Sequence, residues 1–141
     1  MKRFVVVVLA GALLLPALAA CNNKSTAVSA GVSASGSPED LRASAAAVAK
    51  GLGQITTISA TIAATAATDK TSAQASFAEI EPVWSSIEGT VKANDSSAYL
   101  SFEDSFAILE ASAKSGDAIR AATASASVAA TVKAYLAKYP G

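Results

Sequence analysis

Acidic residues are the part of this sequence whose type and spacing best fit a chemical task. Between Glu79 and Glu110 there are seven acidic residues and one basic residue, Lys92, so this segment carries a charge of −7 + 1 = −6 in a chain with a formal net charge of zero. Carboxylate oxygens are preferred ligands of hard cations such as iron(III), calcium, magnesium and manganese. Cation binding is therefore the first function to consider.

The residue types that are missing exclude several other classes of site. The chain has no histidine, which excludes histidine-ligated zinc, histidine-ligated haem and catalytic triads. The single cysteine, Cys21, excludes an intramolecular disulfide and a thiolate metal cluster. Since no nucleophile is paired with a base and no basic stripe carries interleaved aromatic residues, we predict neither catalysis nor nucleic-acid binding.

Two consecutive helices are predicted to carry the acidic residues. Apolar side chains recur at steps of three and four residues on both sides of Asn94-Asp95-Ser96, which interrupts the pattern. Two such helices joined by a tight turn form an antiparallel hairpin. Pro82 predicts a bend or a new helix start within the first of them. The apolar seam consists of Phe77, Ile80, Trp84, Ile87 and Val91, followed by Tyr99, Phe102, Phe106, Leu109 and Ala113.

The position of this seam also predicts where the glutamates lie. If seam residues occupy heptad positions a and d, four glutamates fall at position e, which faces position e of an antiparallel partner. Glu88 is then near the level of Glu103, and Glu81 near the level of Glu110. Two interpretations remain open: the glutamates flank the core in water, where screening weakens their repulsion, or they form a site for a hard cation.

Two further helices complete the predicted domain, residues 38–141. Ser37-Pro38-Glu39-Asp40 is a helix-start signal, and the helix that it opens is expected to reach about Ala67, with a possible break at Gly51–Gly53. Thr68-Asp69 starts the second helix, Asp95 or Ser96 the third, and Ser115-Gly116 ends the third. Asp117 starts the fourth, whose predicted apolar stripe is Ile119, Ala122, Ala126, Val128, Val132, Tyr135, Leu136 and Tyr139. The predicted fold is all-α, an up-down-up-down four-helix bundle.

The segment before this domain resembles a targeting sequence. Met1-Lys2-Arg3 precedes a short apolar run that ends in Leu18-Ala19-Ala20-Cys21, similar to the cleavage motif of bacterial lipoproteins. We therefore expect a signal peptide at 1–20, and a lipidated Cys21 with a flexible tether at 21–37. An ordinary secretory signal is the alternative. Asn22 after the cysteine favours outer-membrane sorting in enteric-type bacteria, and a Gram-positive cell surface is the other location considered.

The central hairpin resembles a known family. Trp84-Ser-Ser-Ile87-Glu88-Gly89-Thr-Val91-Lys92, followed by Tyr99-Leu-Ser-Phe102-Glu103-Asp104, is similar to the helical periplasmic domain associated with bacterial high-affinity iron permeases. Imelysin-like iron-uptake proteins are a looser parallel. The resemblance implies that Glu88, Glu103 and Asp104 occupy acidic motif positions, that iron is the cation, and that an iron permease is a partner. The Ala-rich first helix and Pro82 depart from the family pattern.

Two functions follow as hypotheses. The first is a lipid-anchored, non-enzymatic bundle outside the cytoplasmic membrane that binds or presents a metal cation, with iron as the expected ion, through Glu81, Glu88, Glu103, Asp104 and Glu110. The second is a structural or interaction lipoprotein that binds another envelope protein and no metal.

The lipidation hypothesis predicts that radiolabelled fatty acid is incorporated into the wild-type protein and not into Cys21→Ser, because only the cysteine thiol accepts the acyl-bearing group. The measurement is autoradiography of the immunoprecipitated protein. Cleavage of both forms without label would identify an ordinary secretory signal instead.

Overall fold

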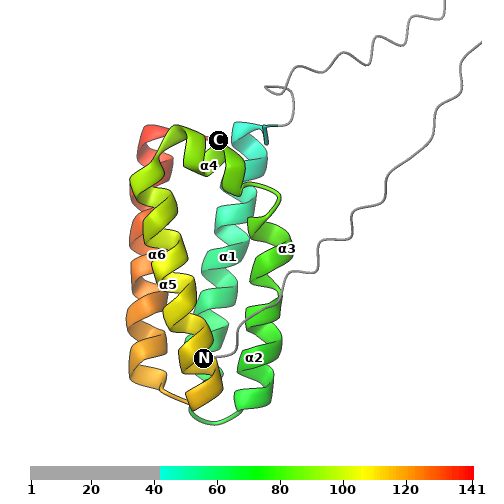
Figure 1. The fold of residues 1–141 in the computed structure, drawn as a ribbon, viewed down its shortest axis with the longest axis vertical. Helices are drawn as coiled ribbons and strands as arrows, with labels where there is room; N and C mark the ends of the chain where they lie inside the picture. Colours follow the sequence, from blue (N-terminus) through cyan, green and yellow to red (C-terminus); the bar gives the residue numbers. More distant parts are fainter. Residues whose placement is uncertain (1–41) are drawn as a thin grey trace, which may run out of the picture. The chain divides into compact units, whose positions relative to one another are not determined.

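The computed structural model describes residues 42–141, which form helices joined by short turns (Figure 1). The predicted all-α fold is confirmed for this part of the chain. The predicted signal peptide, Cys21, the tether and residues 38–41 lie outside the described residues. The helices are α1 (Ala45–Thr65), α2 (Lys70–Ala78), α3 (Ile80–Trp84), α4 (Glu88–Asn94), α5 (Ser96–Ser115) and α6 (Ala118–Lys138).

Helices α1, α5 and α6 run lengthwise beside one another, and α2 and α3 together form a fourth leg of the helical unit (Figure 1). Helix α1 packs against α6 and α2, while α5 packs against α6, α2 and α4. The short α4 lies across one end, between the fourth leg and α5 (Figure 1). None of the helices in residues 42–141 has the length and hydropathy that crossing a membrane requires.

Three aspartates start helices where the sequence predicts them. The carboxylates of Asp69, Asp95 and Asp117 accept hydrogen bonds from the backbone N–H three residues further on, at 2.9, 3.0 and 3.0 Å. Each satisfies a donor that has no partner within its helix. The predicted stop after α5 is also confirmed, because Gly116 adopts a left-handed conformation with φ 82°.

The first helix differs from its prediction at the N-terminus. The prediction of a continuous helix from Pro38 is wrong, since Arg42–Ser44 are not helical and α1 begins at Ala45. Ser44 has an extended backbone, and its hydroxyl accepts a hydrogen bond from Ala47 N–H at 3.2 Å, so Ser44 is the N-cap.

The two glycines do not break α1, which is continuous to Thr65. Gly51 instead makes room for a neighbour, because a Cβ at this position would lie 3.0 Å from Ile87 Cδ1. Gly53 faces open space.

The second predicted helix is divided into three pieces. A new start near Pro82 is confirmed, since α2 ends at Ala78 and α3 begins at Ile80. The interruption at Ser85–Ile87 was not predicted. There Ile87 N–H donates to the Trp84 carbonyl at 2.9 Å, in a turn that redirects the chain into α4. The apolar seam continues through this turn, with Ile87 and Val91 both buried.

The core changes in composition along the helical unit. Near α4 it contains large side chains, Trp84, Phe102, Phe106 and Tyr135, whereas near the α1–α2 and α5–α6 turns it contains Ala66, Ala73, Ala113, Ala121 and Ala124. Alanine permits close helix approach but buries little apolar area per residue. The aromatic side chains toward α4 therefore bury more apolar area per residue than these alanines do.

The predicted stripe of the fourth helix is wrong at its N-terminal end. Ile119 is 82% exposed, and the buried positions of α6 are Ala121, Ala124, Val128, Val132 and Tyr135. These positions follow the three-four rule, and Ile119 lies two residues off their register. The buried face of this part of α6 consists of two small alanines, Ala121 and Ala124. The prediction placed the larger Ile119 on that face because of its hydrophobicity.

Polar contacts connect the C-terminal end of α6 to the α4–α5 turn. Asn94 donates to the Tyr135 hydroxyl at 2.9 Å, and the Tyr139 hydroxyl donates to the Asn94 carbonyl at 2.8 Å. Lys138 Nζ lies 2.9 Å from Asp95 Oδ2. Burial raises the pKa of Tyr135, while the Ala98 N–H and Lys138 hold the pKa of Asp95 below its ordinary value.

The lowered pKa of Asp95 predicts that the folded state loses stability in acid. Because the pKa of Asp95 is lower in the folded state, its contribution is present above the ordinary pKa of 3.8 and is lost as the pH falls below it. Asp95→Asn keeps a capping oxygen but no charge, so its free energy of unfolding should fall less than that of the wild type between about pH 6 and about pH 3. Urea titrations across this range give the measurement.

The exposed Asp104 provides a matched control for that experiment, since Asp104→Asn removes a charge from the same helix without touching the Asp95–Lys138 contact. It should keep the wild-type acid dependence. Equal slopes in the wild type and Asp95→Asn would contradict the prediction.

Candidate acidic cavity

A cavity of about 420 Å³ lies between the leg formed by α2–α4 and helix α5. All four glutamates predicted at the facing positions line it, together with several apolar side chains. The lining residues are Phe77, Ile80, Glu81, Trp84, Glu88, Tyr99, Glu103, Phe106, Ala107 and Glu110. We call this feature the acidic cavity.

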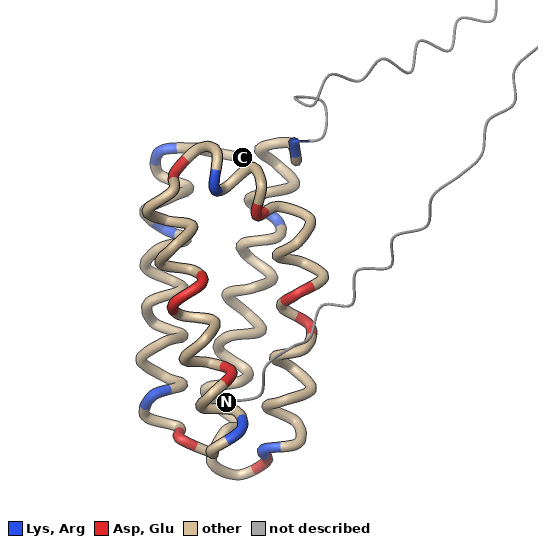
Figure 2. Tube along the Cα trace, viewed as in Figure 1, with Lys and Arg blue, Asp and Glu red and all other residues tan. Residues whose placement is uncertain are grey.

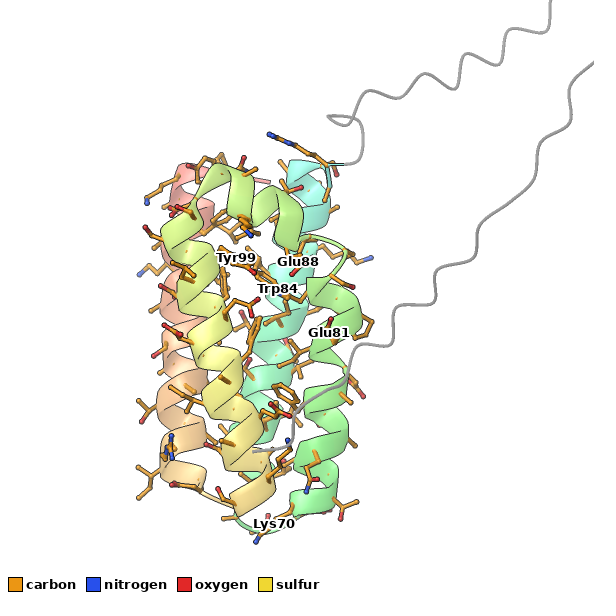
Figure 3. All side chains as sticks on the ribbon, in the orientation of Figure 1. Lys70, Glu81, Trp84, Glu88 and Tyr99 are labelled. Carbon is orange, nitrogen blue, oxygen red and sulfur yellow. The ribbon has the colours of Figure 1, made fainter. Side chains whose placement is uncertain are left out.

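The remaining predicted site residues lie elsewhere. Asp104 is exposed and does not line the acidic cavity. Within the cavity, Glu81 is exposed, while Glu88, Glu103 and Glu110 are half-buried. In Figure 3 the side chains of Trp84, Glu88 and Tyr99 lie close together between α3 and α5, with Glu81 further along the same leg.

One hydrogen bond fixes a carboxylate at the cavity wall. Trp84 Nε1 donates to Glu103 Oε1 at 2.7 Å, and Trp84 is 3% exposed. A buried indole N–H without an acceptor costs free energy, so this contact holds the Glu103 side chain in one orientation. Glu103 and its predicted partner Glu88 both line the cavity.

Trp84 is also the centre of an aromatic cluster behind the cavity. Its ring centroid lies 5.9 Å from that of Tyr99 in a stacked arrangement, and 5.2 Å from those of both Phe102 and Phe106. These separations lie in the range in which aromatic pairs attract each other. Glu103 therefore lies on a packed aromatic wall.

The lining of the cavity is acidic, with four glutamates, of which Glu110 is paired with Lys114. None of the residues that line it is basic, and Figure 2 shows acidic positions along both α3–α4 and α5. In residues 42–141 the ion pairs are Lys114–Glu110 and Lys138–Asp95, of which only the first involves a lining residue. Lys92 Nζ lies 4.9 Å from the centroid of the Tyr99 ring. The lining therefore carries an excess of negative charge.

The carboxylates are spread along the cavity rather than gathered at one point. No three acidic side chains in residues 42–141 are close enough together to hold one metal ion. Glu103 and Glu110 are seven residues apart on one helix, which is about 10.5 Å at 1.5 Å per residue. A small ion therefore meets the glutamates singly or in pairs.

Sequence reasoning found the four glutamates and the apolar seam beside them, but it did not predict that both line one cavity. It treated Trp84 as a core anchor and did not assign a partner to its N–H. The signal was present, because a buried tryptophan requires an acceptor and the next predicted helix places Glu103 directly after the seam residue Phe102.

Comparison of the chain with protein-family models, with curated proteins and with solved structures finds no match. The function is accordingly argued from the cavity itself.

The aromatic cluster predicts a large effect of Trp84→Ala on stability. Removing a fully packed indole should lower the free energy of unfolding by about 3–5 kcal/mol, because it leaves a void and frees Glu103. Urea unfolding followed by circular dichroism gives the value. Ile119→Ala, at a position that is 82% exposed, should change it by less than about 0.5 kcal/mol. A loss below about 1 kcal/mol for Trp84→Ala would contradict the packing described here.

Proposed function

We propose that this protein binds a cation reversibly in the acidic cavity, outside the cytoplasmic membrane, and presents it for uptake. The observation that carries this proposal is the convergence of Glu81, Glu88, Glu103 and Glu110, from two legs of the fold, on a cavity whose lining includes no basic residue. Clefts lined by charges of one sign concentrate counter-ions.

The location follows from the sequence. A signal peptide at 1–20 and a lipidated Cys21 would hold the domain at a membrane surface facing the periplasm or cell exterior, with 21–37 as a tether. An outer-membrane position is favoured if the cell is Gram-negative. Anchoring would keep the cavity close to a permease, which is the partner that the family resemblance implies.

The mechanism is binding rather than catalysis. The cavity offers carboxylates and an apolar wall, and no nucleophile stands beside a base among its lining residues. Iron is the inorganic cation implied by the family resemblance, and carboxylate oxygens suit it. Because no three carboxylates meet at one point, such an ion would keep part of its water shell and leave easily.

This proposal predicts that a cation stabilises the folded domain. A cation that binds only the folded state, at a hundredfold excess over its dissociation constant, stabilises it by about 2.7 kcal/mol, which is several degrees in melting temperature for a domain of this size. The measurement is thermal unfolding of the chain that starts after Cys21, with and without iron, calcium or manganese. Glu88→Gln with Glu103→Gln should abolish the shift and slightly raise the metal-free melting temperature, because it removes like charges.

A matched control removes two charges outside the cavity. Glu79 and Asp104 are exposed and do not line it, so Glu79→Gln with Asp104→Asn should keep the shift. Glutamine at position 103 can still accept from Trp84, which keeps the test variant folded. If no cation raises the melting temperature of the wild-type protein, the glutamates are solvent-exposed residues beside the core. The protein-interaction hypothesis then replaces this one.

A further inference from the structure

A groove separate from the acidic cavity lies between α1 and α3, which are side by side (Figure 1). It consists of two hollows of about 360 and 330 Å³, which adjoin each other because Gln54 and Val83 line both. Helix α1 contributes lining residues between Ala47 and Ile58, and the opposite side contributes residues between Glu79 and Ile87. We call this feature the α1–α3 groove.

The floor of the α1–α3 groove is apolar, because the two helices approach each other closely there. Gly51 has no side chain, and a Cβ at this position would lie 3.0 Å from Ile87 Cδ1 and 3.5 Å from Val83 Cγ1. Val83 and Ile58 line the groove and are only half-buried, so part of each apolar side chain remains in contact with water. A second apolar surface that covers these side chains would remove them from water, which is favourable.

The α1–α3 groove carries one charge of each sign. Lys50 is its only basic lining residue and Glu79 its only acidic one. Both side chains are exposed, and neither belongs to an ion pair within residues 42–141. Each is therefore available to pair with a charge on another molecule.

These two charges lie at opposite ends and on opposite sides of the groove. Lys50 belongs to α1 and lines the first hollow, whereas Glu79 directly precedes α3 and lines the second hollow with Ile58. Eight residues of α1 separate Lys50 from Ile58, which is about 12 Å at 1.5 Å per residue. A two-fold axis perpendicular to the groove, near Gln54 and Val83, exchanges both its ends and its sides. Such an axis brings Lys50 of one copy opposite Glu79 of the other, and forms the same contact a second time.

We propose that the α1–α3 groove is the interface of a two-fold symmetric dimer of this protein, with Val83 near its centre and two Lys50–Glu79 ion pairs at its ends. The charges favour a second copy as the occupant, because the groove is complementary to itself. A different protein would have to present both charges at the matching places. Neither charged residue lines the acidic cavity, so this interface does not depend on cation binding.

The size of the groove predicts a reversible dimer. Its α1 side, from Ala47 to Ile58, is about 16 Å long, whereas stable interfaces bury roughly 800 Å² on each partner. Association should therefore depend on protein concentration, and salt should weaken it, because exposed ion pairs are screened.

Sedimentation velocity of the chain that starts after Cys21, at low salt and increasing concentration, tests this interface. The wild type should shift from monomer toward dimer. Glu79→Lys and Lys50→Glu should each weaken self-association by at least about tenfold, because two-fold symmetry converts both attractive pairs into repulsive ones. An equal mixture of the two variants should form dimers again, since one copy then presents two glutamates and the other two lysines.

Charge reversals outside the groove provide the matched controls. Asp104 and Lys133 are exposed and line neither hollow, so Asp104→Lys and Lys133→Glu should associate as the wild type does. A wild type that stays monomeric at every concentration would overturn the inference and leave the groove to a different protein partner. A dimer that both groove variants leave unchanged, or a mixture that does not associate, would overturn it as well.

Discussion

The N–H of Trp84 is the group on which the described fold and its cavity both depend. The indole must be buried, because it connects Tyr99, Phe102 and Phe106 into one cluster. A buried donor needs an acceptor, and the acceptor here is the carboxylate of Glu103 at 2.7 Å. A charged carboxylate in turn needs water or a cation on its free side. Burying this tryptophan therefore requires an opening beside it, and the acidic cavity is that opening.

The composition of the core changes along the helices. Alanines are buried near the α1–α2 and α5–α6 turns, while four large aromatic side chains are buried toward α4. The cavity runs past both regions, from Tyr99 to Glu110 along α5. The turn at Ser85–Ile87 then directs α4 across the end of the unit, which places Glu88 beside Trp84 and Tyr99 (Figure 3). The alanine-rich and aromatic parts of the core follow from the same sequence of small and large buried residues.

Local signals in the sequence were enough for much of this architecture. Aspartate caps at positions 69, 95 and 117 and the glycine at 116 mark helix ends through interactions within a few residues, so the sequence predicts them well. The register across α3–α5 was not accessible in this way, since it depends on the turn at Ser85–Ile87 and on Ile87 packing against Gly51 in a distant helix. The heptad argument predicted that four glutamates face one another, and all four line one cavity, but it could not show that Trp84 donates its N–H to Glu103.

The spacing of the glutamates also determines what kind of site the fold can sustain without a ligand. Two carboxylates about 10 Å apart in water repel by only about 0.4 kcal/mol, and physiological salt screens much of that. A core whose far end is mostly alanine has little stability to offset a larger repulsion. Three carboxylates gathered around one metal ion would repel far more strongly when the ion leaves. The dispersed arrangement lets the domain remain folded while empty, which is the property that a protein needs if it is to capture a cation and release it again.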